Sequence, residues 1–206
     1  SLEKIVIPAP PLEVQHKIAM ILNSFKELEA ELEAELEAEL EARRDQYTFF
    51  RDSLLDFENS SSLSPKFADP TTVRWVTVGE FGTFLSGLSG KVKADFTGGN
   101  GEYLPYTSVY NNNRVVLTGL PTVQVGENER QNELAPGDIV FTGSSETAED
   151  VGMTSVVIEA PERPVYLNSF CFILRPRGTS IMYPRFASHL FRSRSVRRQV
   201  TKAASG

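Results

Sequence analysis

The sequence contains little of the chemistry that enzymes commonly use. Its 206 residues include one cysteine and two histidines. A single cysteine excludes a disulfide within the chain, and Cys171, in the apolar stretch SFCFIL, is predicted to be a small buried hydrophobe. His16 and His189 each lie in a predicted helix, without a cysteine or second histidine at metal-ligand spacing, so we interpret both as structural.

Nucleotide-binding and nucleophile motifs are also missing. The sequence has no P-loop, no GxGxxG after a strand and no GxSxG. SGLSGK at 86–91 lacks the four-residue gap before its Gly-Lys and the Ser or Thr after it. SSETAEDVG at 144–152 has acidic groups for a cation, but is more typical of a solvated loop. We therefore expect a binding module that is not an enzyme, with no metal site.

Long apolar runs are absent too. No stretch approaches membrane-spanning length, and no basic-plus-apolar leader opens the sequence. Together with the single cysteine, this predicts a cytoplasmic protein without a membrane partner. Because the sequence starts without Met, we expect a fragment or a processed chain.

Acidic residues are missing from 163–206, a segment that holds nine Lys or Arg. The overall net charge of −6 hides this asymmetry. Residues 1–62 hold 14 acids and 6 bases, whereas residues 63–206 hold 13 acids and 15 bases. Clustered arginines can neutralise phosphates, so the basic segment favours nucleic acid as a partner. A solvated basic face is the alternative.

What the sequence has in abundance is the repeat LEAELEAELEAELEA at 28–42. Its four-residue period matches neither the 3.6 residues of an α-helical turn nor the 3.5 of a coiled coil. It lies within a predicted helix of residues 25–57, about 50 Å long. The predicted apolar stripe comprises Leu28, Leu32, Leu36, Leu40, Tyr47, Phe50 and Leu54. Such a stripe is expected to pack on another long helix; a fully solvated single helix is the alternative.

A short strand, 2–7, and a first helix beginning at Pro11 are predicted to precede the repeat. SFKE at 24–27 is a possible capping box for a second helix, although Asn23 and Ser24 could also continue the first. Residues 58–70 are polar and typical of a linker or helix exit. We therefore divide the chain into 1–62 and 63–206.

The second segment predicts a mostly β domain. Short β-branched and aromatic runs, punctuated by Gly, Pro and Asn, are VRWVTVGEFGTFLSG, RVVLTGL, GDIVFTG, MTSVVIEA and VYLNSFCFILRP. TGGNGE at 97–102 predicts a flexible turn or hairpin tip. Residues 183–204 predict a basic helix whose inner positions are Phe186, Leu190 and Val200. The predicted fold class is α+β: a long coiled-coil-like helix, a mostly β domain and a basic C-terminal helix.

TSVYNNNR at 107–114 has the composition of a loop that reads DNA. Asn pairs with adenine and Arg with guanine, and Tyr110 can stack or contact the backbone. An ordinary Asn-rich turn is the alternative.

Two parts of the sequence resemble the specificity (S) subunits of type I restriction–modification systems. The first is IPAPPLEVQHKIAMIL with RRDQYTFFRDSLL, which is similar to their conserved region. The matching positions are Ile7, Pro8, Pro10, Pro11, Leu12, Gln15, Gln46, Tyr47, Phe50, Arg51, Leu54 and Leu55. The second part resembles a target recognition domain, in VRWVTVGEFGTF, LAPGDIVFTGSS and QVTKAASG.

The resemblance implies a non-catalytic subunit that reads one half of a bipartite site in double-stranded DNA. It implies recruitment of methyltransferase subunits, which use S-adenosylmethionine, so that this chain itself binds no cofactor. Restriction subunits can join such complexes. In this family, four-residue repeats in the spacer helix set the distance between recognition domains. One tetrapeptide adds roughly 6 Å, against about 3.4 Å per base pair.

An S subunit has two recognition domains and two such helices, whereas this chain has one of each. We therefore expect half an S subunit that forms a homodimer through antiparallel spacer helices. Such a dimer would read a split palindrome. The predicted DNA contacts are Lys91, Lys93, Tyr110, Asn111, Asn112, Asn113, Arg114, Ser144, Arg192, Arg194, Arg197 and Arg198.

Two other functions compete with this one. A coiled-coil scaffold whose β domain binds a protein would not show salt-sensitive binding to duplex DNA. A nuclease or methyltransferase would need the cofactor loop or metal cluster that the sequence lacks. The target DNA sequence cannot be read from these residues.

Overall fold

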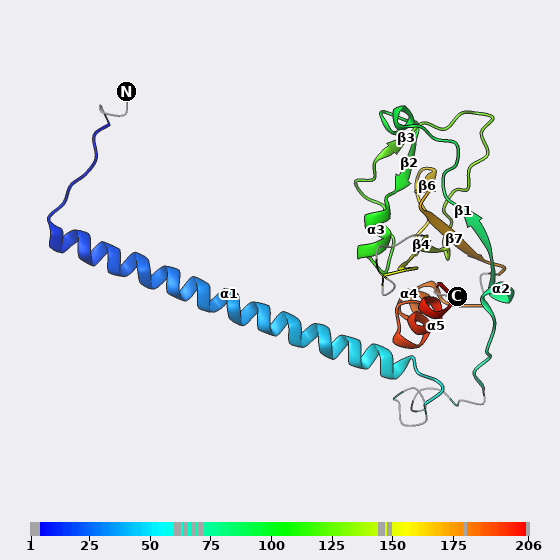
Figure 1. Ribbon diagram of the computed structural model, residues 1–206, viewed down its shortest axis with the longest axis horizontal. Coiled ribbons are helices and arrows are strands. Elements are labelled where there is room, and N and C mark those ends of the chain that lie inside the picture. The colour runs from blue at the N-terminus through cyan, green and yellow to red at the C-terminus, as the bar shows by residue number, and fades with distance from the viewer. Residues whose placement is uncertain are drawn as a thin grey trace. The chain divides into compact units, whose positions relative to one another are not determined.

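A computed structural model describes residues 5–59, 63, 66, 69, 72–143, 147, 150–178 and 181–204. The chain separates into two compact units, Ser1–Phe50 and Arg51–Gly206, each considered by itself below (Figure 1). Among the described residues, no helix has the length and apolar character needed to cross a bilayer. The predicted division at 62/63 stays a prediction.

The first unit is dominated by one uninterrupted helix, α1 (Leu12–Leu54), of 43 residues. The Pro11 carbonyl accepts from the N–H groups of Val14 and Gln15, which starts the first turn directly after the prolines, as predicted. Ser24 does not start a second helix: its hydroxyl donates to the Met20 carbonyl at 3.1 Å, back along the same helix. The predicted strand is absent at residues 5–7, which have no regular structure, and residues 2–4 lie outside the described part.

The apolar stripe of the repeat is exposed within the first unit. No residue of α1 is buried. The four leucines of the repeat are 51–61% exposed. Ion pairs one turn apart, Glu13–Lys17 at 2.6 Å and Glu39–Arg43 at 2.7 Å, support the helix.

The second unit contains two small sheets. The four-stranded sheet is antiparallel throughout and is ordered β1 (Gly82–Ser86), β7 (Cys171–Pro176), β4 (Ile139–Thr142), β5 (Thr154–Val156). The three-stranded sheet is ordered β3 (Thr122–Val123), β2 (Gly101–Leu104), β6 (Val165–Leu167), with β2 parallel to β6. These strands, followed by a C-terminal helical segment, confirm the predicted α+β class.

Short helices complete the unit: α2 (Val78–Phe81), the 3₁₀ helix η4 (Lys93–Phe96), α3 (Tyr106–Asn111), α4 (Pro184–Leu190) and α5 (Arg194–Ala204). The predicted C-terminal helix is therefore two helices. The Ser193 hydroxyl donates to the Leu190 carbonyl at the break. Ala187 and Phe191 are the buried apolar residues there, whereas the predicted inner residue Phe186 is 37% exposed.

Several predicted local structures are wrong. RVVLTGL forms no strand and makes only an isolated bridge, between Arg114 and Val156. TSVYNNNR is mostly the helix α3 rather than a loop. TGGNGE is no free hairpin tip, because a Cβ at Gly99 would lie 1.9 Å from the carbonyl carbon of Val123. The Asn100 amide also bonds both backbone groups of Val125. The local sequence patterns used to predict strands and turns did not reveal these long-range contacts.

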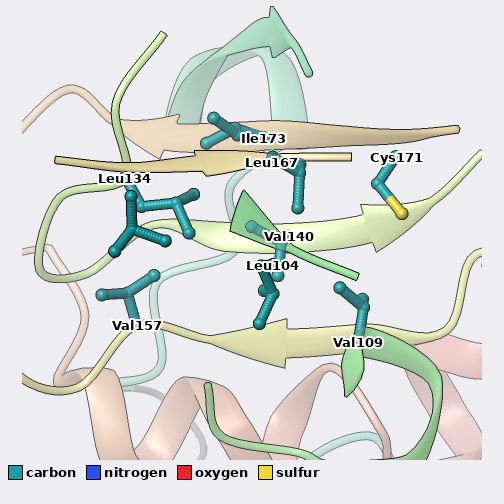
Figure 2. Close-up of a cluster of buried hydrophobic side chains, with 9 residues drawn as sticks. Leu104, Val109, Leu134, Val140, Val157, Leu167, Cys171 and Ile173 are labelled. Carbon is teal, nitrogen blue, oxygen red and sulfur yellow. The ribbon is translucent and has the colours of Figure 1, made fainter. Parts of the chain in front are cut away.

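Alternation along the strands gives the four-stranded sheet two buried faces. Val140 and Ile173 point to one face, where they join Leu104, Leu167 and other residues of the second sheet and α3 (Figure 2). Ile139, Phe141 and Leu174 point to the other face, where they pack on Ala187 and Phe191. The core is thus built on both sides of β4 and β7. Cys171 is buried among these side chains, as predicted, and burial raises its pKa to about 12.

The buried carboxylate of Asp138 organises the entry into β4. Asp138 is 1% exposed and accepts a bidentate bond from Arg175 of β7, with Nε–Oδ1 at 2.9 Å and Nη2–Oδ2 at 2.7 Å. Its Oδ2 also accepts from the Ala135 N–H, and the same guanidinium donates to the Glu133 carbonyl. Gly137 permits the turn with a φ of +89°. The hydrogen bond that the Arg175 guanidinium donates to the Asp138 carboxylate raises the pKa of Arg175.

We predict that Asp138→Ala lowers the free energy of unfolding by about 2–4 kcal/mol, because it strands the Arg175 guanidinium and the Ala135 N–H. Urea unfolding followed by near-ultraviolet circular dichroism measures the change. Asp45→Ala, at an exposed position on α1, is the control and should stay within about 0.5 kcal/mol of the wild type. Equal effects of the two substitutions would contradict the proposed role of Asp138.

Candidate nucleic-acid interface

Arg192 connects the C-terminal segment to the end of α3. Its guanidinium Nη2 donates to the carbonyls of Val109, Tyr110 and Asn112 at 2.8–2.9 Å, and its Nε donates to the Thr154 carbonyl at 2.7 Å. A cation at the end of a helix satisfies carbonyls that have no partner within the helix. Arg192 thereby brings together two predicted DNA-binding segments that are about 80 residues apart, but its own donors are engaged inside the protein.

The other three predicted arginines lie on α5 and differ in exposure: Arg197 is partly buried, whereas Arg194 and Arg198 are exposed. Arg197 points inward: its Nη1 donates to the Gly152 carbonyl at 2.7 Å, and burial lowers its pKa. Arg194 and Arg198 are exposed, one helical turn apart, and Lys202 continues the same row a further turn on. None of these three cations has an acidic ion-pair partner among the described residues. They form a row of positive charge, the α5 basic row.

The start of α5 is hydrogen-bonded to Asp52, in the last turn of α1. The Asp52 carboxylate accepts from the Arg194 backbone N–H at 3.0 Å and from the Arg51 Nε at 2.9 Å. A carboxylate at the first turn of a helix satisfies a free N–H and complements the helix dipole. Asp52 therefore helps to fix the helix that carries the α5 basic row.

Arg114 lines a shallow cavity. The cavity has a volume of about 250 Å³, and its lining includes Arg114, Arg185, Thr118 and Glu159. The Arg114 Nη2 lies 3.5 Å from the His189 Nε2. Partial burial, and then the charge of Arg114, lower the pKa of His189, which favours the neutral imidazole. Two exposed guanidinium groups that line one cavity can bind an anionic or acceptor-rich ligand.

Tyr110 and the three asparagines that follow it, at the end of α3 and just beyond it, have different surroundings. The Tyr110 hydroxyl donates to Asp150 Oδ1 at 2.7 Å, which raises the pKa of Tyr110. The Asn112 amide donates to the Ser108 carbonyl, and the Asn113 carbonyl accepts from the Val156 N–H. Asn111 is exposed. Of this segment, Asn111 and Arg114 are therefore the most accessible side chains.

Lys91 and Lys93 lie beside the end of β3. Figure 1 shows β3 at the end of the second unit away from α5. Lys91 is 8% exposed, and its ammonium donates to Glu129 and to the Gln124 carbonyl. Lys93 is exposed at the start of η4. The structure thus gives Lys91 an internal ion pair and leaves Lys93 to solvent. Ser144 lies outside the described residues.

Sequence reasoning missed Arg185 as a site residue and left Lys202 out of its set. The signal for Lys202 was available, because residues 194, 198 and 202 share one helical face. No sequence pattern placed Arg185 beside Arg114, since a fold contact brings them to the same cavity. Among the described residues, no group of three His, Cys, Asp or Glu could hold a metal ion.

The N-terminal part of the chain is similar to known proteins. Residues 1–42 match the family model described as the type I restriction modification DNA specificity domain. Two Mycoplasma pneumoniae proteins that carry the name of type I specificity subunits, S.MpnORF615P and S.MpnORF201P, are 47% and 45% identical over 58 and 56 residues. The chain resembles type I specificity subunits. These stretches cover 28% and 27% of this chain.

Solved structures of specificity subunits are also similar. The HsdS subunit of Thermoanaerobacter tengcongensis is 21% identical with a TM-score of 0.47, and the S subunit of M. genitalium is 20% identical with a TM-score of 0.45. The matches include 95% and 93% of this chain, but 44% of each specificity subunit. The curated specificity subunits are matched over 20% and 18% of their length. The activity of a whole specificity subunit is therefore a proposal for this chain.

We predict a pH effect at the Lys91–Glu129 pair. The Lys91 ammonium and the Gly126 N–H lower the pKa of Glu129 from 4.5 to about 2. A lowered folded-state pKa contributes stability that is present above about pH 4.5 and is lost as the pH falls towards 2. In Lys91→Met, a carboxyl NMR titration should show the Glu129 pKa rising towards 4.5. Lys93→Met is the matched control and should leave the titration unchanged; an unchanged titration in both variants would exclude the ion pair.

Proposed function

We propose that this chain is a DNA-recognition module of a type I restriction–modification complex, without catalysis of its own. The observation that carries the proposal is the match of residues 1–42 to a DNA specificity domain, supported by 47% identity to a specificity subunit. The recognition domain would read one half of a bipartite site. Methyltransferase subunits, recruited through the conserved region, would supply S-adenosylmethionine and the chemistry.

The charges of the second unit support a specific DNA-binding surface. The α5 basic row would contact phosphates, because its cations are exposed and have no acidic ion-pair partner among the described residues. Arg114 and Asn111 would contact base edges, for which guanidinium and amide groups are suited. Arg192 and Arg197, with donors engaged by backbone carbonyls, would hold this surface in shape.

A homodimer is part of the proposal. Two copies paired through antiparallel α1 helices would present two equal recognition domains, with a target that is a split palindrome. The leucines of the repeat support this arrangement, since no other described residue of the first unit covers them. The repeat would act as a ruler, each unit adding roughly 6 Å.

We predict that Arg198→Ala weakens binding to all duplex sequences similarly and lowers the salt slope by about 1, because one phosphate contact is lost. Fluorescence anisotropy over a salt series measures both quantities. Arg130→Ala removes an exposed arginine next to Glu129 and should leave both unchanged. Equal loss in Arg198→Ala and Arg130→Ala would indicate general charge attraction instead of a defined surface. Arg192→Ala should instead lower the free energy of unfolding.

Arg114→Ala is predicted to relax the preference at one base pair, by about 1–3 kcal/mol, with little change in the salt slope. Binding to a set of single-base variants of the target measures this preference. An equal loss of affinity for all variants of the target would contradict a base contact and indicate that Arg114 contacts phosphate.

A methylome tests the whole proposal. The chain is co-expressed with the methyltransferase subunit of the same genome, and modified bases are mapped by long-read sequencing. A split palindromic motif is the expected result. A stable complex without new methylation would mean that a second, different recognition domain is needed. If no complex forms and duplex DNA is not bound, an adaptor function through the leucine stripe becomes the better hypothesis.

A further inference from the structure

The apolar positions of α1 follow a spacing that reads the same in both directions. The positions of the seam are Val14, Ile18, Ile21, Phe25, Leu28, Leu32, Leu36, Leu40, Arg43, Tyr47, Phe50 and Leu54. The successive intervals are 4, 3, 4, 3, 4, 4, 4, 3, 4, 3 and 4 residues. This series is a palindrome, and its midpoint is Ala34. Eleven of the twelve residues are apolar, and these eleven are 37–64% exposed.

A palindromic spacing is what an antiparallel pair of identical helices requires. In such a pair with its twofold axis at residue 34, residue i lies level with residue 68 − i of the second copy. The seam positions then meet one another: Val14 with Leu54, Ile18 with Phe50, Ile21 with Tyr47, Phe25 with Arg43, Leu28 with Leu40, and Leu32 with Leu36. A parallel pair would gain nothing from the mirror symmetry.

The same intervals explain the four-residue period of the repeat. The segments 14–28 and 40–54 follow a 3.5-residue spacing, which drifts around a straight helix by about 20° per heptad. The repeat follows a spacing of four, which drifts about 40° per unit in the opposite sense. Over the whole seam the mean period is about 3.6 residues per turn, that of a straight α-helix. The repeat thus returns the seam to one side of α1.

Leucine and alanine are sorted between opposite sides of the helix. At about 100° per residue, Ala30, Ala34 and Ala38 lie about 180° from the seam. Each repeat unit therefore has one large apolar side chain facing the seam and one small side chain facing away from it. This sorting indicates a single covered face rather than a helix packed all round.

From these observations we infer that a second copy of this chain covers the seam of α1, antiparallel, with the twofold axis at Ala34. The inference rests on the dimer of the proposed function and adds its register. Eleven apolar side chains at about 60–120 Å² each would bury about 700–1,300 Å² per copy. A stable interface buries about 800 Å² per partner.

The register also brings like charges together. Residues 27–41 hold eight glutamates and no Lys or Arg. In the proposed pair Glu27 lies level with Glu41, and Glu33 with Glu35. Repulsion between these segments is screened by salt. Dimerisation should therefore strengthen as salt is added, whereas binding to DNA weakens.

A competing register places the axis at Leu36. It would set Glu29 level with Arg43 and bring Leu22 into the seam in place of Ile21. The seam would then lose Leu28 and Val14. The two registers differ in where the ends of the helices lie, so distance measurements between copies separate them.

Spin labels at Asn23→Cys and at Asp45→Cys provide this test. Both residues are exposed, lie about 180° from the seam and are 11 residues from Ala34 on either side. Buried Cys171, with a pKa of about 12, should not react with the label. In dimers of either single variant, the two labels should be equally separated, by about 33 Å along the helix axis. An axis at Leu36 would give about 39 Å for residue 23 and about 27 Å for residue 45, and would overturn the register.

A matched pair of substitutions tests the occupant of the seam. Leu36→Glu places a charge in the seam, and Ala38→Glu places the same charge on the opposite side. Sedimentation equilibrium should give a monomer for Leu36→Glu and a dimer for Ala38→Glu, each over a salt series. A wild-type chain that stays monomeric at about 100 µM, or equal behaviour of the two variants, would overturn the inference. Anisotropy on half-site DNA then distinguishes the proposals: a monomer that still binds DNA contradicts only the dimer, whereas loss of DNA binding in every variant contradicts the proposed function.

Discussion

The second unit contains an ion pair that is made to a buried carboxylate. Asp138 and Arg175 join β4 to β7, and these two strands separate the two halves of the core. The pair also holds the turn through Ala135 and the carbonyl of Glu133, the residue that bridges to β6 through Tyr166. A buried carboxylate is tolerated only when its partners are fixed. The pair therefore links β4, β7 and the segment that bridges to β6.

Arginine is used for two different purposes in the basic C-terminal segment. Arg192 and Arg197 donate hydrogen bonds to backbone carbonyls of α3, β5 and the turn at Gly152. They therefore stabilise the fold from inside. Arg192 lies in the turn between α4 and α5, whereas Arg194, Arg197 and Arg198 lie on α5 and differ in helical phase. Charge counting treats all four alike, and the fold separates them. The net charge of a segment thus indicates the kind of partner, while helical phase indicates which side chains can reach it.

The sequence predicts the large features of this chain because they are local. The long helix follows from Ala, Glu and Leu between prolines and a polar exit, and β4, β5 and β7 follow from short apolar runs. The missed features depend on distant contacts. α3 is a helix of only six residues whose terminal carbonyls are satisfied by Arg192. Gly99 is fixed by its approach to Val123, and Arg185 joins Arg114 through folding. Which predicted residues touch DNA remains a prediction.

The palindromic seam has a consequence for how such a helix can change. All intervals in the middle of the seam are four residues, so gaining or losing one LEAE unit preserves the mirrored order and moves the axis by two residues. Tandem repeats are stretches in which such gains and losses come as whole units. Each unit would rotate everything beyond it by about 40° and shift it by about 6 Å, in steps comparable to those along a DNA duplex. In the proposed dimer, self-pairing would survive a change in the length of α1, and that change would alter the spacing of the proposed target.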